Sequence, residues 1–165
     1  MNTLLKASAR MPHHTDLHRV FAALDDRQRE FDWLLTDFEL SFHPPGLPYL
    51  AGPERVLWLS GERLSAIVGA HVVQFIWAVL SGFRPGVEPD LARLDPYPFA
   101  DGNDALRQPG VQIQHPLAAV EIVCYDSSAT LLLSRDDDLT RRFRAHFPEA
   151  VDLDGYNRRT RPSPR

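Results

Sequence analysis

The chain has 165 residues, of which 44% are apolar and 24% are charged. This ordinary composition excludes collagen-like, coiled-coil and wholly disordered proteins, and the length suits one domain with a substantial core. The formal net charge is −4, but residues 156–165 carry four Arg and no acid, which leaves 14 basic and 22 acidic residues elsewhere. Because an acidic surface repels phosphate, this balance disfavours nucleic acid as the main ligand and favours a basic protein partner.

The chain start contains the signals of a first helix. We expect residues 1–14 to be frayed and the globular body to span 15–155 of a single domain over 1–165. Thr15 or Asp16 is a suitable N-cap. Apolar residues then recur at helical spacing, at Leu17, Val20, Phe21 and Leu24. The spacing predicts a helix that ends near Asp25-Asp26.

The segment Phe31–Phe42 shows two alternations of opposite parity, which a bulge near Thr36-Asp37 would reconcile in one strand. A helix is the competing interpretation. Residues 43–53 hold four prolines and two glycines, so we predict a surface loop there. Its prolines would fix Leu47 and Tyr49 as exposed apolar contacts for a partner; the alternative, slightly favoured, is a rigid connector packed against the body.

Residues 55–60 predict a short strand, and Ser60 is a suitable N-cap for a helix over 61–70. Helical spacing continues as far as Val79, so one long helix is an alternative. We prefer a helix followed by a buried strand at 72–80, because β-branched and aromatic residues are concentrated there.

The stretch Leu64–Phe83 has no formal charge and is about as long as a membrane span. His71 and Gln74 lie near its middle, where polar groups are most costly in a bilayer. We therefore predict that it is buried in the protein core and that the chain has no membrane segment.

Residues 84–118 form the least regular part of the sequence, interrupted by six prolines. We expect one short strand within it, at 111–114. A long irregular stretch is uncommon in a compact domain and is often functional where it occurs.

The C-terminal third is regular again. Strands are predicted at 119–125 and 130–133, joined by a hairpin turn at Asp126-Ser127-Ser128. Ser134 is expected to cap a helix that Pro148 ends, with an apolar face formed by Leu139, Phe143 and Phe147. We expect residues 156–165 to form a mobile, Arg-rich tail. Hairpin-joined strands with segregated helices predict an α+β fold, with a mostly antiparallel sheet and two to three helices packed on it.

No pattern in the sequence predicts a catalytic residue, a metal site or a cofactor. Cys124 lies in an apolar strand, where thiols are usually inert, although a histidine beside it would make it a candidate nucleophile. His14 and His18 have a spacing that permits two metal ligands, but a structural site needs four, and CxxC and HExxH motifs are absent. A Cys- or His-dependent hydrolase and a homo-oligomeric accessory or scaffold protein are the alternatives to a binding role.

Compartment and source follow from two further counts. A single cysteine precludes an internal disulfide, and the first residues contain no apolar leader, so we expect a cytoplasmic protein. Arg outnumbers Lys 17 to 1, a bias typical of GC-rich coding sequences, which indicates a bacterial source.

The stretch Glu121–Leu153 resembles the C-terminal part of small uncharacterised bacterial α+β proteins. The shared elements are the strand that ends in Cys124-Tyr125-Asp126-Ser127-Ser128, the strand after it, and the helix that closes on Phe147-Pro148. Trp58–Phe83 has a similar character. Proteins of this kind resemble the immunity proteins of bacterial toxin systems. The resemblance implies stoichiometric binding without catalysis and assigns no functional residues.

The sequence therefore predicts a small, non-catalytic, immunity-like protein that binds another protein, such as a basic toxin. No cofactor and no specific nucleic acid is expected, and the oligomeric state is left open. The expected contacts are exposed apolar and acidic side chains: Leu47, Tyr49, Glu88, Asp90, Asp95, Asp101, Asp104 and Asp126.

Overall fold

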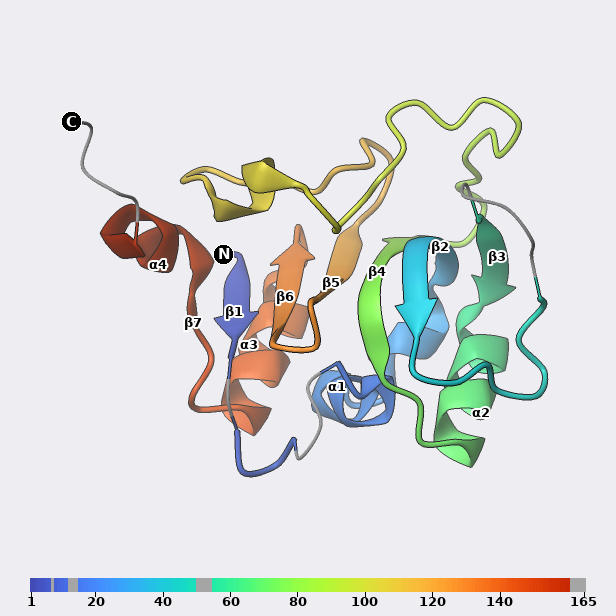
Figure 1. The fold of residues 1–165 in the computed structure, drawn as a ribbon, viewed down its shortest axis with the longest axis horizontal. Helices are drawn as coiled ribbons and strands as arrows, with labels where there is room; N and C mark the ends of the chain where they lie inside the picture. The colour runs from blue at the N-terminus through green and yellow to red at the C-terminus, as the bar shows by residue number, and fades with distance from the viewer. Residues whose placement is uncertain (7, 12–14, 50–54, 161–165) are drawn as a thin grey trace.

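The computed structural model describes residues 1–6, 8–11, 15–49 and 55–160. Its centre is an antiparallel sheet of seven strands in the order β3-β2-β4-β5-β6-β1-β7 (Figure 1). The strands are β1 (Thr3–Leu5), β2 (Asp32–Leu40), β3 (Leu57–Ser60), β4 (Phe75–Phe83), β5 (Val120–Tyr125), β6 (Ala129–Ser134) and β7 (Val151–Asp152). The predicted α+β class with a mostly antiparallel sheet is confirmed.

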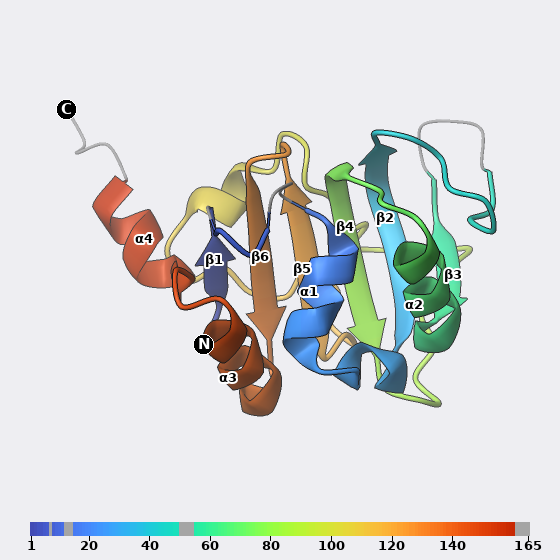
Figure 2. The same ribbon diagram turned by 90° about the horizontal axis from the view of Figure 1, so that it is seen from below.

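Three helices cover one face of the sheet (Figure 2). They are α1 (Leu17–Leu24), α2 (Gly61–Ala70) and α3 (Asp137–His146), while a fourth, α4 (Leu153–Thr160), lies beyond the β7 edge. A short 3-10 turn, η1 (Arg27–Glu30), follows α1. The larger core lies between the sheet and these helices and includes Leu17, Phe21, Trp33, Leu35, Leu80, Ile122 and Phe143.

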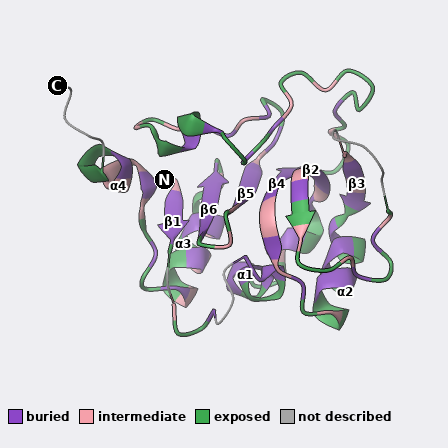
Figure 3. Ribbon diagram, in the orientation of Figure 1, coloured by how far each residue is buried: buried purple, intermediate pink, exposed green. Residues whose placement is uncertain are grey.

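The irregular segment 84–118 covers the opposite face of the sheet, and it contains the 3-10 turn η2 (Asp104–Arg107). Side chains on alternate strand positions face this second layer. They pack against Leu106 of η2 in a smaller core that also includes Leu34, Val79, Phe83, Val123, Leu131 and Leu133. The central strands are therefore buried on both sides (Figure 3).

Several local signals act as predicted. Asp16 caps α1 by accepting the His18 N–H at 3.0 Å, and Ser60 caps α2 by accepting from Arg63. The register of β2 against β4 shifts after Thr36, as the predicted bulge requires, and Asp37 at the shift has a left-handed φ of 47°. The stretch Leu64–Phe83 divides into α2 and β4, so the single long helix is excluded. Among the described residues, no helix is both long and apolar enough to cross a membrane.

Four expectations about the secondary structure and the chain ends are wrong. The N-terminus is not frayed at residues 3–5, because β1 pairs with β6 and β7 inside the sheet. The tail is not mobile from 156 onward, because α4 continues to Thr160; residues 161–165 lie outside the described part. Residues 111–114 form no strand. Asp136, not Ser134, caps α3, while the Ser134 hydroxyl accepts the Asp136 N–H at 2.9 Å.

Candidate functional site

The most unusual part of the molecule is the irregular segment, and polar side chains of the sheet hold it in place. In the β2 bulge, one carboxylate oxygen of Asp37 accepts the backbone N–H groups of Ala100 and Asp101 at 2.6 and 2.8 Å. The neighbouring Thr36 hydroxyl donates to the Pro98 carbonyl at 2.6 Å. The bulge that the alternation predicted thus provides the attachment point for the loop.

A second attachment point is the buried carboxylate of Glu121 in β5. Its Oε1 accepts the Ser81 hydroxyl and the His115 N–H, each at 2.9 Å, and its Oε2 accepts the Gln114 N–H at 2.8 Å. Burial raises the pKa of Glu121, and the three hydrogen bonds offset only part of this effect. Gln114 in turn accepts the Phe99 N–H at 3.0 Å, which connects the two halves of the segment.

Acidic side chains cover the outside of this fixed segment. Leu91 and Phe99 lie among them and keep 44% and 41% of their surface exposed. The part of the segment that carries these acids, residues 84–104, contains two arginines, of which Arg84 pairs with Asp136 at 3.6 Å. The five acids predicted as contacts are all exposed, and none forms an ion pair with another described residue: Glu88, Asp90, Asp95, Asp101 and Asp104.

The other predicted contacts lie elsewhere. Tyr49 is 78% exposed and packs edge-on against His43, but Leu47 is only 5% exposed and belongs to the larger core, so its assignment as an exposed contact is wrong. The loop 41–49 follows the end of β2, and the acidic segment follows the end of the antiparallel β4, so the two lie at opposite ends of these strands (Figure 1). Asp126 is exposed in the β5–β6 turn, with a φ of 48°.

The candidate nucleophile and the candidate metal ligands do not form a reaction centre. Cys124 is fully buried in the larger core, and burial raises the pKa of its thiol. No hydrogen bond joins it to a histidine in the described part of the chain. His18 is exposed, and His14 lies outside the described residues. No group of three or more potential metal ligands occurs within 1–6, 8–11, 15–49 and 55–160.

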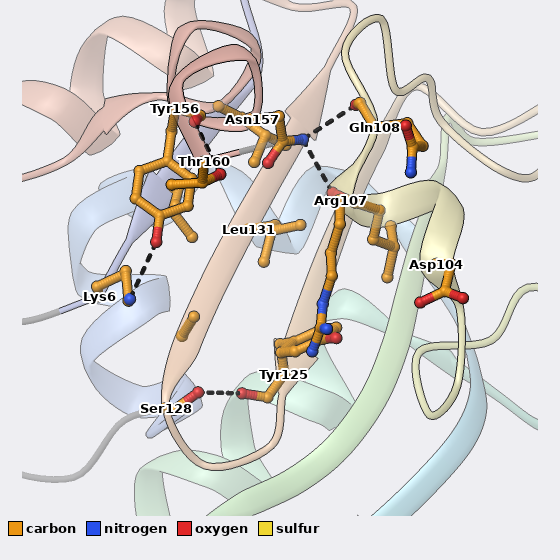
Figure 4. A pocket seen from close by; sticks show the side chains of 14 residues that line it. Lys6, Asp104, Arg107, Gln108, Tyr125, Ser128, Leu131, Tyr156, Asn157 and Thr160 are labelled. Atoms are coloured by element: carbon orange, nitrogen blue, oxygen red, sulfur yellow. Dashed lines mark hydrogen bonds between the residues drawn. The ribbon is translucent and has the colours of Figure 1, made fainter. Parts of the chain in front are cut away.

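One feature of the structure was missed by the sequence analysis: a cavity of about 530 Å³ between η2 and α4, over β1, β5 and β6 (Figure 4). Two of its walls include stretches for which the sequence predicts a frayed or mobile chain. Leu4 and Lys6 lie within residues 1–14, and Tyr156, Asn157 and Thr160 lie within residues 156–165. The signal was present in the sequence, because α4 directs its lining residues into the cavity at helical spacing: Leu153, Tyr156, Asn157 and Thr160.

Comparison with known proteins adds no assignment, since neither a protein-family model, nor a curated protein, nor a solved structure matches the chain.

Proposed function

We propose that this chain is a cytoplasmic bacterial protein that acts without catalysis, by binding a basic protein partner in the manner of a toxin-system immunity protein. The observation that carries the proposal is the set of five unpaired carboxylates on segment 84–104, which is hydrogen-bonded to the sheet at Pro98, Ala100 and Asp101. If these acids served only to keep the loop soluble, the loop would not need its hydrogen bonds to the sheet.

The clamps matter because a flexible loop loses conformational entropy when it binds, whereas a preorganised loop does not. The Asp37 hydrogen bonds already order the loop at Ala100 and Asp101, and the Glu121 hydrogen bonds order the segment that follows it at Gln114 and His115. Unpaired carboxylates steer a cationic partner during encounter and disfavour acidic ones. Leu91 and Phe99 supply the apolar contacts that hold a complex once it has formed.

The burial of Cys124 supports a binding role over a cysteine-dependent hydrolase. A nucleophilic thiol must reach its substrate and must be deprotonated, and here it is inaccessible and its pKa is raised. Among the described residues, no histidine forms a hydrogen bond with the buried Cys124, so no base is held beside the thiol.

The test uses the purified full chain and each basic protein encoded beside its gene, with binding measured by titration calorimetry at low and moderate salt. We expect one of these proteins to bind with one-to-one stoichiometry and with an affinity that falls as salt rises. The triple variant Glu88→Gln/Asp90→Asn/Asp95→Asn is expected to bind at least about tenfold more weakly. Asn at position 90 keeps the oxygen that accepts the Ala92 N–H, so the loop geometry is retained.

A matched control removes the same charge from the helical side of the molecule, in the triple variant Glu62→Gln/Asp137→Asn/Glu149→Gln. These three side chains are exposed, and we expect less than about a twofold change in affinity. The proposal fails if no neighbouring basic protein binds, or if the two triple variants weaken binding equally.

A further inference from the structure

The cavity between η2 and α4 has the construction of a binding site. The Asn157 side-chain amide in α4 donates to two carbonyls on the other wall, those of Leu106 at 3.1 Å and Gln108 at 3.0 Å. Asp154, also in α4, accepts the Gly110 N–H. These bonds connect the two walls and fix the distance between them, so the cavity is preformed.

The cavity floor is apolar and its sides are aromatic. Leu4 in β1 and Leu131 in β6 are partners in the sheet register and form the floor together with Leu106 and Leu153. Tyr125 and Tyr156 stand at the sides (Figure 4). An apolar floor with a few polar groups around it, at a volume of about 530 Å³, is typical of sites for small organic molecules.

Two cations line the same cavity. Lys6 Nζ lies 5.4 Å from the centre of the Tyr156 ring and donates to its hydroxyl at 3.1 Å, and the Arg107 guanidinium lies 5.3 Å from the centre of the Tyr125 ring. Neither cation forms an ion pair within the described part of the chain, and Asp104, the one acid in the lining, pairs with neither. Their charges are therefore available to a ligand.

We propose that this cavity binds a small organic anion. The apolar, ring-containing body of the ligand lies on the leucine floor between the two tyrosines. Its acidic group pairs with Lys6 beside Tyr156, while Arg107, beside Tyr125 on the opposite side of the cavity, adds a second positive charge (Figure 4). Both cations are exposed, and the charge-assisted hydrogen bonds that they can donate are the reason to expect selection for an anion and not merely for an apolar molecule. The site shares only Asp104 with the acidic segment, and it has the opposite charge preference.

A pair of fluorescent probes tests both parts of the proposal. Anilinonaphthalene sulfonate has an aromatic body and a negative charge, and N-phenylnaphthylamine has the same body without the charge. We expect the wild-type protein to bind the sulfonate at one site per chain, at least about tenfold more tightly than the neutral probe. The variant Lys6→Gln/Arg107→Gln is expected to lose this preference while it retains the affinity for the neutral probe.

Two further variants separate the cavity from the rest of the surface. Ala129 lines the cavity from β6, and Ala129→Leu is expected to weaken both probes because the added carbons occupy the space. Arg19→Gln removes an exposed cation from α1, on the other face of the sheet, and is expected to leave both affinities unchanged. Circular dichroism melting of each variant checks that it folds cooperatively.

Lys6 offers an independent readout because it is the only lysine in the chain. Reductive methylation with isotopically labelled formaldehyde gives one side-chain resonance besides that of the N-terminal amine, and it retains the positive charge. We expect saturating sulfonate probe to shift the Lys6 resonance and the neutral probe to shift it less. Equal affinity for the two probes, sulfonate binding that survives Lys6→Gln/Arg107→Gln, or an unperturbed Lys6 resonance would each overturn the proposal. None of these outcomes bears on binding of a basic protein by segment 84–104.

Discussion

The carboxylate of Asp37 accepts the backbone N–H of Ala100 at 2.6 Å, across 63 residues of sequence. The backbone at Asp37 is left-handed, with a φ of 47°, which places its side chain at the bulge where β2 departs from the regular register. A defect in one strand therefore determines where the longest irregular segment of the protein is attached.

The variant Asp37→Gly tests this attachment. Gly tolerates a positive φ, so the substitution removes the carboxylate without straining the bulge. Loss of two charge-assisted hydrogen bonds on a half-buried site is expected to lower the free energy of unfolding by about 2 kcal/mol. Hydrogen exchange at the amides of Ala100 and Asp101 should accelerate at least about tenfold, while Asp37→Asn, which keeps an acceptor oxygen, should change it less. Unchanged exchange in Asp37→Gly would show that other contacts fix the segment.

Substitution by Ala at two glycines of α2, Gly61 and Gly69, is expected to change the free energy of unfolding in opposite directions. A Cβ on Gly61 would lie 2.6 Å from the Phe31 carbonyl oxygen and still closer to that of Gln28, and backbone atoms cannot move aside as flexible side chains do. Gly61→Ala should therefore lower the free energy of unfolding by about 3 kcal/mol. Gly69 has no atom within 4 Å of a built Cβ, so Gly69→Ala should raise it by roughly 0.5 to 1 kcal/mol through helix propensity. Urea denaturation measures both, and equal effects would refute the argument.

A second matched pair concerns buried threonine hydroxyls in the sheet. Among the described residues the Thr130 hydroxyl has no hydrogen-bond partner, so Thr130→Val should raise the free energy of unfolding by about 1 kcal/mol. The Thr36 hydroxyl donates to the Pro98 carbonyl at 2.6 Å, so Thr36→Val should lower it by about 2 kcal/mol. If Thr130→Val destabilised the protein as much as Thr36→Val, the Thr130 hydroxyl would have an undetected partner, such as a buried water.

Elements with strong local signals could be predicted from the sequence. The Asp16 and Ser60 caps, the apolar stripe of α1 and the parity change at Thr36 each depend on residues within one element. The failures concern elements that are stabilised by distant partners. β1 has only three residues, too few to show an alternation, and it exists because β6 and β7 pair with it on either side.

The cavity as a whole could not be predicted for the same reason, although helical spacing indicates the residues of its α4 wall. Its walls come from β1, η2 and α4, and Asn157 reaches the carbonyls of Leu106 and Gln108, about 50 residues away in sequence. Conversely, Leu47 looks like an exposed anchor in a proline-rich loop, but a neighbouring apolar surface is available to bury it. Local composition predicts that a loop exists and does not predict which of its side chains face the core.

The buried carboxylate of Glu121 gives the protein a pH dependence with a defined sign. Burial raises its pKa in the folded state above the ordinary value of 4.5. As pH rises through the interval between these two values, the unfolded chain releases its proton and the folded protein retains it. The folded state then binds more protons, so the free energy of unfolding falls with rising pH, by at most about 1.4 kcal/mol per pH unit.

To isolate this effect, the free energy of unfolding of the wild type and of Glu121→Gln is measured by urea denaturation at a series of pH values from 4.5 to 8. His115 contributes in the opposite direction, because burial lowers its pKa and so favours folding as pH rises toward 6.5. His115 is present in both proteins, so its contribution largely cancels in the difference. We expect the advantage of wild type over the variant to be greatest near pH 4.5 and to shrink as pH increases. A difference that grew with pH would mean that the hydrogen bonds from Ser81, Gln114 and His115 outweigh burial and keep Glu121 ionised in the folded protein.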